Sequence, residues 1–200
     1  MSQAPEVTII IPNYNGRELL KNCIETLEHQ TCLDFKLLVV DNGSTDGSVE
    51  LTSEILDFEM IALSENTGFC GAVNIGIKNT KTPYLILLNN DTETKPQFVE
   101  ALLAGIKKSD RIFSCGAMMI DYHNRELIDN AGDYYTALGW AVARGKGKLI
   151  ADYSTEKKVF SACGGAVIYR TDVINKIGEF EMVQMPFDEY KRQIREAFIK

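Results

Sequence analysis

The sequence predicts an α/β fold with a mostly parallel central sheet flanked by helices. Apolar, β-branched runs alternate with amphipathic stretches through the first half of the chain, which is the pattern of successive βαβ units. Three of the apolar runs end abruptly in short polar side chains, at 13–16, 41–44 and 89–91. Because the carboxyl ends of parallel strands share one edge of a sheet, we expect these polar turns to form a ligand site.

The first half divides into elements by hydrophobic periodicity and by Gly, Pro and Asn turns. We expect strands at 7–11, 35–40, 59–63 and 84–88 and helices at 17–30, from about 46 to 56, at 69–78 and at 96–107. Ser44 or Asp46 can cap the second of these helices. The run 84–88 is apolar throughout and suits a strand buried on both faces, but the polar residues after it could also be a turn that caps the next helix.

The regular alternation of predicted strands and helices ends after residue 109. Residues 112–120 are again apolar, whereas 121–153 are polar, aromatic and Gly-rich without a clear period, which is typical of a functional loop region. Residues 159–169 have strand character with Gly164 and Gly165 in the middle, and Thr171 can cap a short helix that ends at Gly178. Residues 187–200 predict an amphipathic helical tail.

The composition of the chain disfavours several classes of protein function. The chain has 200 residues and a net charge of −7, which disfavours nucleic acid and broad contact with an anionic membrane. Its five cysteines are scattered without a Cys-x-x-Cys pair, which favours free thiols in a reducing compartment, and no signal peptide is recognisable at the start. We therefore expect a cytoplasmic protein. The Gly-rich signatures of dinucleotide-binding Rossmann domains and of P-loops are absent after the first strand.

Four motifs, in this order, resemble the amino-terminal half of family 2 glycosyltransferases, and most of all the rhamnosyltransferase-like enzymes of bacterial polysaccharide assembly. They are V-T-I-I-I-P-N-Y-N-G, V-V-D-N-G-S-T-D-G-S, N-T-G-F-C-G-A-V-N-I-G and L-L-N-N-D-T-E. The resemblance covers about 7–178. It implies a GT-A fold, a UDP- or dTDP-sugar donor, a divalent cation (Mn²⁺ or Mg²⁺) and inverting transfer to a saccharide or lipid-linked acceptor. It further implies a single domain at 1–186, in which residues 1–108 bind the nucleotide sugar and residues 109–186 form the acceptor side.

The resemblance assigns roles to individual residues. Asn89, Asn90 and Asp91 stand in the place of the family's Asp-x-Asp motif, with Asp91 as the residue expected to meet the metal. Because Asn89 replaces an acid, the cation would arrive chiefly with the donor diphosphate. The resemblance implies further donor-site residues. Pro12 and Tyr14 would border the base, and Asp41 and Asn42 would hydrogen-bond the pyrimidine. Gly68 and Asn74 would lie against the ribose and the diphosphate, and Gly164 and Gly165 would lie close to the donor sugar.

The catalytic base is where the chain departs from similar proteins. These usually continue with Gly-Phe-Asp-Glu and then a Glu-Asp pair, whereas this chain reads I-G-E-F-E-M-V-Q-M-P-F-D-E-Y. Asp188 and Glu189 are the candidates for the base, and the alternative is that they are solvated residues that open the tail helix. If the base is missing, the chain would be a nucleotide-sugar-binding module without transferase activity. A sugar-phosphate nucleotidyltransferase would need a Gly-rich basic signature after the first strand, which is absent.

A few further residues have two readings each. Tyr134, Tyr135 and Trp140 could stack on an acceptor sugar or pack in the core. His123 could ligate a metal or lie on the surface. The amphipathic tail could dock on the inner face of a membrane, on a partner subunit in a homodimer, or on its own domain.

Overall fold

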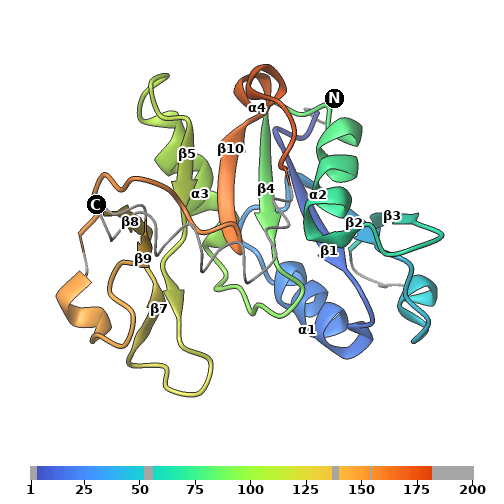
Figure 1. Cartoon of the computed structure of the whole chain (residues 1–200), viewed down its shortest axis with the longest axis horizontal. Coiled ribbons are helices and arrows are strands. Elements are labelled where there is room, and N and C mark those ends of the chain that lie inside the picture. The colour runs from blue at the N-terminus through green and yellow to red at the C-terminus, as the bar shows by residue number, and fades with distance from the viewer. Residues whose placement is uncertain (1–3, 52–55, 137–139, 154, 182–200) are drawn as a thin grey trace, which may run out of the picture.

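The structure is a computed structural model that describes residues 4–51, 56–136, 140–153 and 155–181. Its centre is a six-stranded sheet in the order β3-β2-β1-β4-β10-β5 (Figure 1). The four strands of the first half are parallel, and β10 runs antiparallel to β4 and β5. The strands are β1 (Val7–Asn13), β2 (Phe35–Asp41), β3 (Phe58–Ala62), β4 (Tyr84–Leu88), β5 (Ser114–Gly116) and β10 (Ala166–Arg170). The predicted α/β class with a mostly parallel sheet is confirmed.

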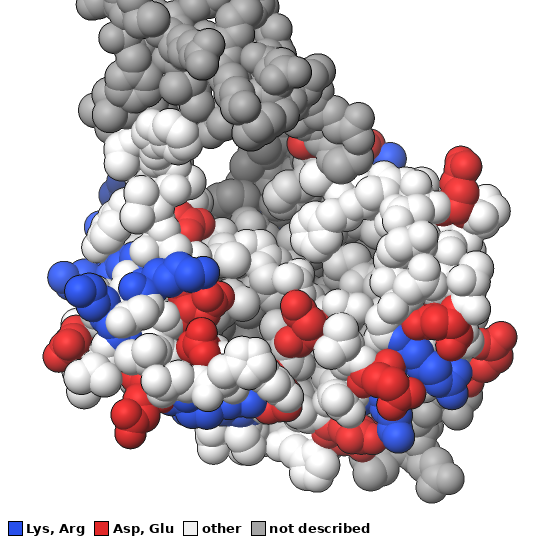
Figure 2. All heavy atoms as spheres, turned by 60° about the horizontal axis from the view of Figure 1, so that its bottom comes forward, with Lys and Arg blue, Asp and Glu red and all other residues white. Residues whose placement is uncertain are grey.

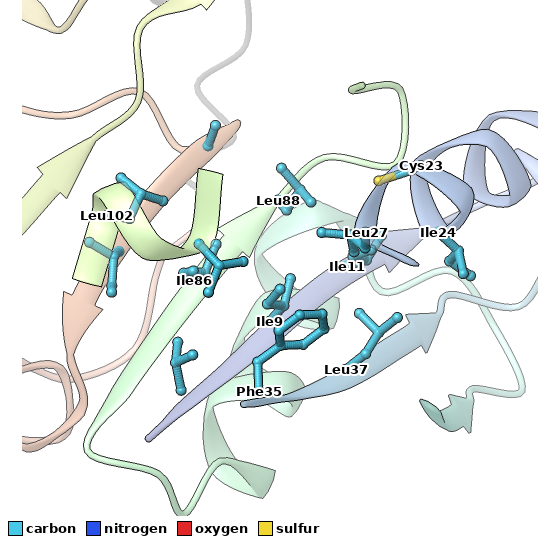
Figure 3. Close-up of a cluster of buried hydrophobic side chains, with 14 of the residues drawn as sticks. Ile9, Ile11, Cys23, Ile24, Leu27, Phe35, Leu37, Ile86, Leu88 and Leu102 are labelled. Atoms are coloured by element: carbon cyan, nitrogen blue, oxygen red, sulfur yellow. The ribbon is translucent and has the colours of Figure 1, made fainter. Parts of the chain in front are cut away.

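Helices cover both faces of this sheet. On one face, α1 (Arg17–Glu28) and α3 (Phe98–Lys107) pack on the odd-numbered side chains of β1, such as Ile9 and Ile11 (Figure 3). On the other face, α2 (Gly68–Asn79) and α4 (Thr171–Ile177) pack around Ile10. The alternation of side chains along a strand explains why a continuous apolar run supplies both cores. Residues 85–88 of β4 are all buried, as predicted for a central strand.

The helix predicted from about 46 to 56 is not formed in the part that the structure describes up to residue 51. This part has a 3-10 turn at Ser48–Glu50, and residues 52–55 lie outside the described residues. Leu51 then takes an extended conformation, with φ −65° and ψ 134°. The turn begins after Gly47, whose φ of 82° lies in the left-handed region that a helix cannot continue through.

The second half is more regular at 121–153 than we expected. The segment contains β7 (Ile128–Asn130), which pairs with β6 (Met119–Ile120), and the hairpin of β8 (Asp133–Tyr135) and β9 (Ala141–Ala143). A 3-10 turn follows at Ile150–Tyr153. The prediction of an irregular loop is therefore wrong for these short antiparallel pairs.

The strand predicted at 159–169 begins only at Ala166, so Gly164 and Gly165 precede the strand and do not lie in its middle. Helix α4 ends at Gly178 as predicted, with φ 110° at that glycine. Thr171 does not cap the helix, because no side-chain cap bond forms and its buried Oγ1 has no partner among the described residues.

The carboxyl-terminal predictions lie beyond the described residues. Asp188, Glu189 and the whole tail at 187–200 fall in this part of the chain. Among the helices that the structure describes, none is both long enough and apolar enough to span a bilayer.

Candidate functional site

The polar ends of three parallel strands meet at one edge of the sheet, as predicted. Asn13 at the end of β1 donates from Nδ2 to Oδ2 of Asp41 at the end of β2, at 2.9 Å. Asn90, which follows β4, donates from Nδ2 to Oδ1 of Asn13 at 2.7 Å. Side chains that are 28 and 77 residues apart in sequence are therefore joined directly. This edge faces the lower side of Figure 1.

The loops that follow β1 and β2 are hydrogen-bonded to each other. Asp41 accepts a second bond at Oδ1 from the Ser44 backbone N–H at 2.8 Å, and Ser44 Oγ accepts from the Asn15 backbone N–H at 2.8 Å. Asp46 accepts from the backbone N–H of Arg17, the first residue of α1, and from Ser48. The hydrogen bond from the Ser48 hydroxyl is the main cause that lowers the pKa of Asp46 below its ordinary value. The loops after β1 and β2 therefore form one hydrogen-bonded unit.

Asp91 differs from Asp41 in exposure and in hydrogen bonding. Asp41 is 1% exposed and bonded through both oxygens, whereas Asp91 is exposed and has no hydrogen bond or ion pair within the described ranges. It is also not a helix cap, because α3 begins at Phe98 with Gln97 as its N-cap. The alternative of a capping turn is therefore wrong. Asp91 is a free carboxylate at the same edge as the strand-end amides.

Gly165 lies directly against the Asn89 turn. The backbone N–H of Asn89 donates to the Gly165 carbonyl at 2.9 Å. A Cβ on Gly165 would lie 3.4 Å from Asn89 Nδ2 and 3.1 Å from Met119 Cε, whereas a Cβ on Gly164 would meet nothing within 4 Å. The Gly164–Gly165 turn thus borders the exposed turn at 89–91, with open space in front of Gly164.

Gly16 makes room for the Asn90 side chain. A Cβ on Gly16 would collide with Asn90 Nδ2 and lie 3.0 Å from Asn13 Oδ1. We expect Gly16→Ala to lower the free energy of unfolding by about 1–2 kcal/mol, the usual cost of overpacking. Gly164→Ala is the control and should change it by less than about 0.5 kcal/mol. Urea denaturation measures both, and equal stability of the two variants would contradict the packing.

Cys23 lies beneath the turn at 89–92. Its buried thiol donates to the Asn89 carbonyl at 3.7 Å, and Sγ lies 3.7 Å from Thr92 Oγ1. Burial is the main cause that raises the pKa of Cys23 from 9.0 to about 11. The thiol is therefore neutral near neutral pH, and Cys23 is a packing residue here.

The raised pKa of Cys23 predicts a pH dependence of stability. Since the thiol ionises more easily in the unfolded chain, the stabilisation is complete below the unfolded pKa and is lost as pH rises toward the folded value. Between about pH 8 and pH 10, the unaltered chain should lose about 1 kcal/mol more unfolding free energy than Cys23→Ala. Urea denaturation at both pH values measures this, and parallel losses would contradict the burial.

A second set of contacts joins this edge to the second half of the chain. The Glu93 carboxylate accepts from the Tyr122 hydroxyl at 3.1 Å and from Arg125 Nη2 at 2.9 Å. The Arg125 guanidinium also lies 4.5 Å from the centre of the Tyr122 ring. Glu93 therefore braces the segment that follows Asp91 against residues 122–125.

Two side chains that we predicted to contact the donor, those of Asn42 and Asn74, are engaged in hydrogen bonds within the protein. Asn42 donates to Asn66 Oδ1 and to the Gly68 carbonyl, and its Oδ1 accepts from the backbone and hydroxyl of Thr67. Asn42 therefore holds the start of α2, and its side chain has no free donor or acceptor for a pyrimidine.

Asn74 is likewise engaged. Its Nδ2 donates to the Phe180 carbonyl and its Oδ1 accepts from the Phe180 N–H, both at 2.9 Å. It fastens the segment after α4 to α2, and this arrangement does not support the predicted contact with ribose and diphosphate. Lys78 and Glu179 form an ion pair at 2.6 Å between the same two segments.

The remaining predicted residues lie around the edge. Tyr14 is 50% exposed and Pro12 is half-buried at the end of β1, so the Tyr14 ring is open to a ligand. Gly68 has φ 76° and begins α2. The residue that the sequence analysis missed is Asn13, which belongs to the first polar turn but was given no role. Its position at the end of a β-branched strand was the available signal.

The aromatic residues of the second half are exposed. Tyr134, Tyr135 and Trp140 are 47%, 55% and 40% exposed, so the alternative that they pack in the core is wrong. The rings of Tyr135 and Phe160 stack with centroids 5.0 Å apart and an interplanar angle of 19°. His123 lies on the surface against Tyr122, and no cluster of three His, Cys, Asp or Glu side chains that could hold a metal occurs in the described part of the chain.

Charge is distributed unevenly over this face. Figure 2 brings the edge forward and shows Lys and Arg side chains grouped toward the sides, while the middle has uncharged side chains and separate Asp and Glu side chains. An anionic ligand at the strand ends would therefore be held by backbone and side-chain amides and by a cation, because basic side chains are not gathered there.

Known proteins share this architecture. The Staphylococcus aureus protein TarS (residues 1–349) superposes with a TM-score of 0.63 at 18% identity, covering 96% of this chain and 55% of that one. The mannosyltransferase PcManGT from Pyrobaculum calidifontis, in complex with GDP-Man and Mn²⁺, gives a TM-score of 0.62 at 14% identity, covering 90% and 48%. These likenesses identify the fold as GT-A.

Sequence comparison gives the family. The chain is 33% identical over 114 residues to a teichoic acid poly(glycerol phosphate) polymerase of Staphylococcus epidermidis, which covers 54% of this chain and 16% of that protein. It is 32% identical over 127 residues to an uncharacterized glycosyltransferase of Rickettsia prowazekii, covering 62% and 40%. The chain thus spans less than half the length of these relatives. The family model of glycosyl transferase family 2 matches residues 8–178, and the chain belongs to this family.

Proposed function

We propose that this chain transfers a sugar from a UDP- or dTDP-sugar to a saccharide or lipid-linked acceptor in cell-surface polysaccharide synthesis, with inversion and with a divalent cation. The observation that carries the proposal is the junction of Asp41, Asn13 and Asn90 at one sheet edge, beside the unpartnered carboxylate of Asp91. Solved structures of TarS with UDP-GlcNAc and with UDP support a nucleotide donor. The rhamnosyltransferase-like subgroup stays a prediction.

The donor set fits a hard cation that is shared with a diphosphate. Asp91 supplies one exposed carboxylate, and the amides of Asn89 and Asn90 supply neutral oxygens beside it. Mg²⁺ and Mn²⁺ accept such sites, in which one or two carboxylates and the substrate phosphates complete the coordination. The cation would stabilise the negative charge that develops on the departing nucleoside diphosphate.

Further residues at this edge could contact the base and the sugar of the donor. The Tyr14 ring is open to a base, and Asp41, although buried, keeps an acceptor position on each oxygen for a pyrimidine N–H. The open space before Gly164 admits a donor sugar close to the backbone. Residues 1–108 would then bind the donor, and residues 109–186 would face the acceptor.

The acceptor side needs a base and a surface for the sugar. In an inverting displacement a carboxylate takes the proton of the acceptor hydroxyl, and Asp188 and Glu189 remain our candidates for it. The exposed pair of Tyr135 and Phe160 offers aromatic faces of the kind that pyranose rings stack on.

Calorimetric titration with UDP, TDP and GDP, each with and without Mn²⁺, tests the proposal. We expect one pyrimidine diphosphate to bind in a Mn²⁺-dependent manner, because the turn at 89–91 offers the free carboxylate of Asp91 and basic side chains are not grouped beside it. Binding without any transfer or hydrolysis of the matching nucleotide sugar would favour the nucleotide-sugar-binding module. No binding by the folded chain would overturn the proposal.

A further inference from the structure

The direction of every hydrogen bond in the row Asp41–Asn13–Asn90 is fixed by its first member. An ionised carboxylate only accepts, so the Asn13 atom 2.9 Å from Asp41 Oδ2 is the amide nitrogen. The other terminal atom of Asn13 is then its carbonyl oxygen, which also only accepts. The Asn90 atom 2.7 Å from it is therefore the nitrogen. The row has one direction, set by the charge of Asp41.

This direction leaves Asn90 with a free acceptor. Its Nδ2 is used by Asn13, while Asn90 Oδ1 has no hydrogen-bond partner within the described ranges. Gly16 leaves room for this nitrogen, because a Cβ there would collide with it. Asn90 is half-buried and adjoins the exposed Asp91, so its carbonyl oxygen and the Asp91 carboxylate belong to one turn.

We propose that Asn13 is a positioning residue of the donor site, which uses the charge of Asp41 to hold Asn90 with its carbonyl oxygen presented beside Asp91. The oxygen is then available to the cation or to a donor hydroxyl, both of which need an acceptor. Asn13 itself is 2% exposed and does not touch the donor. This inference rests on the proposed nucleotide-diphosphate site.

The proposal predicts a non-additive pair of variants. With UDP and Mn²⁺ as the probe, Asn13→Ala and Asn90→Ala should each weaken binding about tenfold, the loss expected for one well-placed polar contact. The double variant should also be weakened about tenfold, because Asn13 acts only through Asn90. A hundredfold loss in the double variant would mean independent roles and would overturn the proposal, as would unchanged binding by Asn13→Ala.

A control variant separates positioning from general stability. Thr8 lies in the same strand as Asn13 and its buried hydroxyl bonds Thr82 at 2.8 Å. Thr8→Val should destabilise the chain, yet bind UDP and Mn²⁺ as the unaltered chain does. Weakened binding by a folded Thr8→Val would show that stability alone explains the loss in Asn13→Ala.

A ligand-free measurement distinguishes this inference from the proposed function. In ¹H–¹⁵N spectra, the Asn90 side-chain amide signals should shift toward free-amide positions in Asn13→Ala and also in Asp41→Asn, which reaches Asn90 only through Asn13. Unchanged Asn90 signals in both variants would contradict the hydrogen-bonded row Asp41–Asn13–Asn90 and would overturn the inference. Failure of the unaltered chain to bind any nucleotide diphosphate, with these shifts present, would instead overturn the proposed donor and with it the use of this row.

Discussion

Asp91→Ala should abolish the Mn²⁺ dependence of nucleotide-diphosphate binding while leaving the fold intact. Asp91 is exposed and unpartnered among the described residues, so its removal breaks no intramolecular contact. It is also the only carboxylate of the 89–91 turn. Loss of this direct ligand should weaken Mn²⁺–UDP binding by about a hundredfold or more, the upper end of what even indirect ligands of a metal contribute. Calorimetric titration measures the change.

Asp110→Ala is the matched control for Asp91→Ala. Asp110 is also a fully exposed aspartate, but it lies 3.6 Å from Arg170, at the end of antiparallel strand β10 and thus at the opposite edge of the sheet. Because Asp110 is fully exposed and Arg170 keeps its bonds to backbone carbonyls, the loss of this pair should cost at most about 1 kcal/mol. Asp110→Ala should bind Mn²⁺–UDP as the unaltered chain does. If the unaltered chain, Asp91→Ala and Asp110→Ala bound Mn²⁺–UDP equally well, Asp91 would not be a ligand of the cation.

Asn74→Leu should strongly destabilise the folded chain. Leucine fills a similar volume but leaves the Phe180 N–H and carbonyl without the two 2.9 Å bonds that they now make. Losing both bonds and stranding their partly buried partners should lower the free energy of unfolding by about 2–3 kcal/mol. For a chain of this size the midpoint of thermal unfolding should fall by roughly 5–10 °C.

Asn79→Leu provides the comparison on the same helix. Asn79 is exposed and donates only to the Ile75 carbonyl one turn earlier in α2, at 2.9 Å. Its replacement should change the free energy of unfolding by less than about 0.5 kcal/mol. If Asn74→Leu were as stable as Asn79→Leu, the two bonds to Phe180 would not hold the segment after α4 to α2.

The first half of the fold could be read from the sequence because its strands are long, β-branched and buried on both faces. The run at 84–88 matches β4 residue for residue, and the helix predicted at 69–78 differs from α2 by one residue at each end. The meeting of the polar strand ends followed from parallel topology alone. Three of the four predicted first-half helices were therefore found close to their expected places.

The roles of individual polar residues could not be read in this way. Asn74 and Phe180 are 106 residues apart, and nothing in a helix sequence shows that an asparagine is committed to a distant backbone. Asn42 is saturated by the loop at 66–68 for the same reason. The second-half strands were missed because β7, β8 and β9 have three residues each, too short for a period of two to be visible.

Paramagnetic broadening by Mn²⁺ tests the location of the donor site most directly. Mn²⁺ added together with UDP should broaden the backbone amide signals of Asn90 and Asp91 first, then those of Asn13 and Gly165, which adjoin the same turn. Without UDP the broadening should be weak, because Asp91 is the only carboxylate of the 89–91 turn. Broadening centred on another acidic region, such as Asp129 and Asp133, with the signals at 89–91 unaffected, would contradict a donor site at the sheet edge.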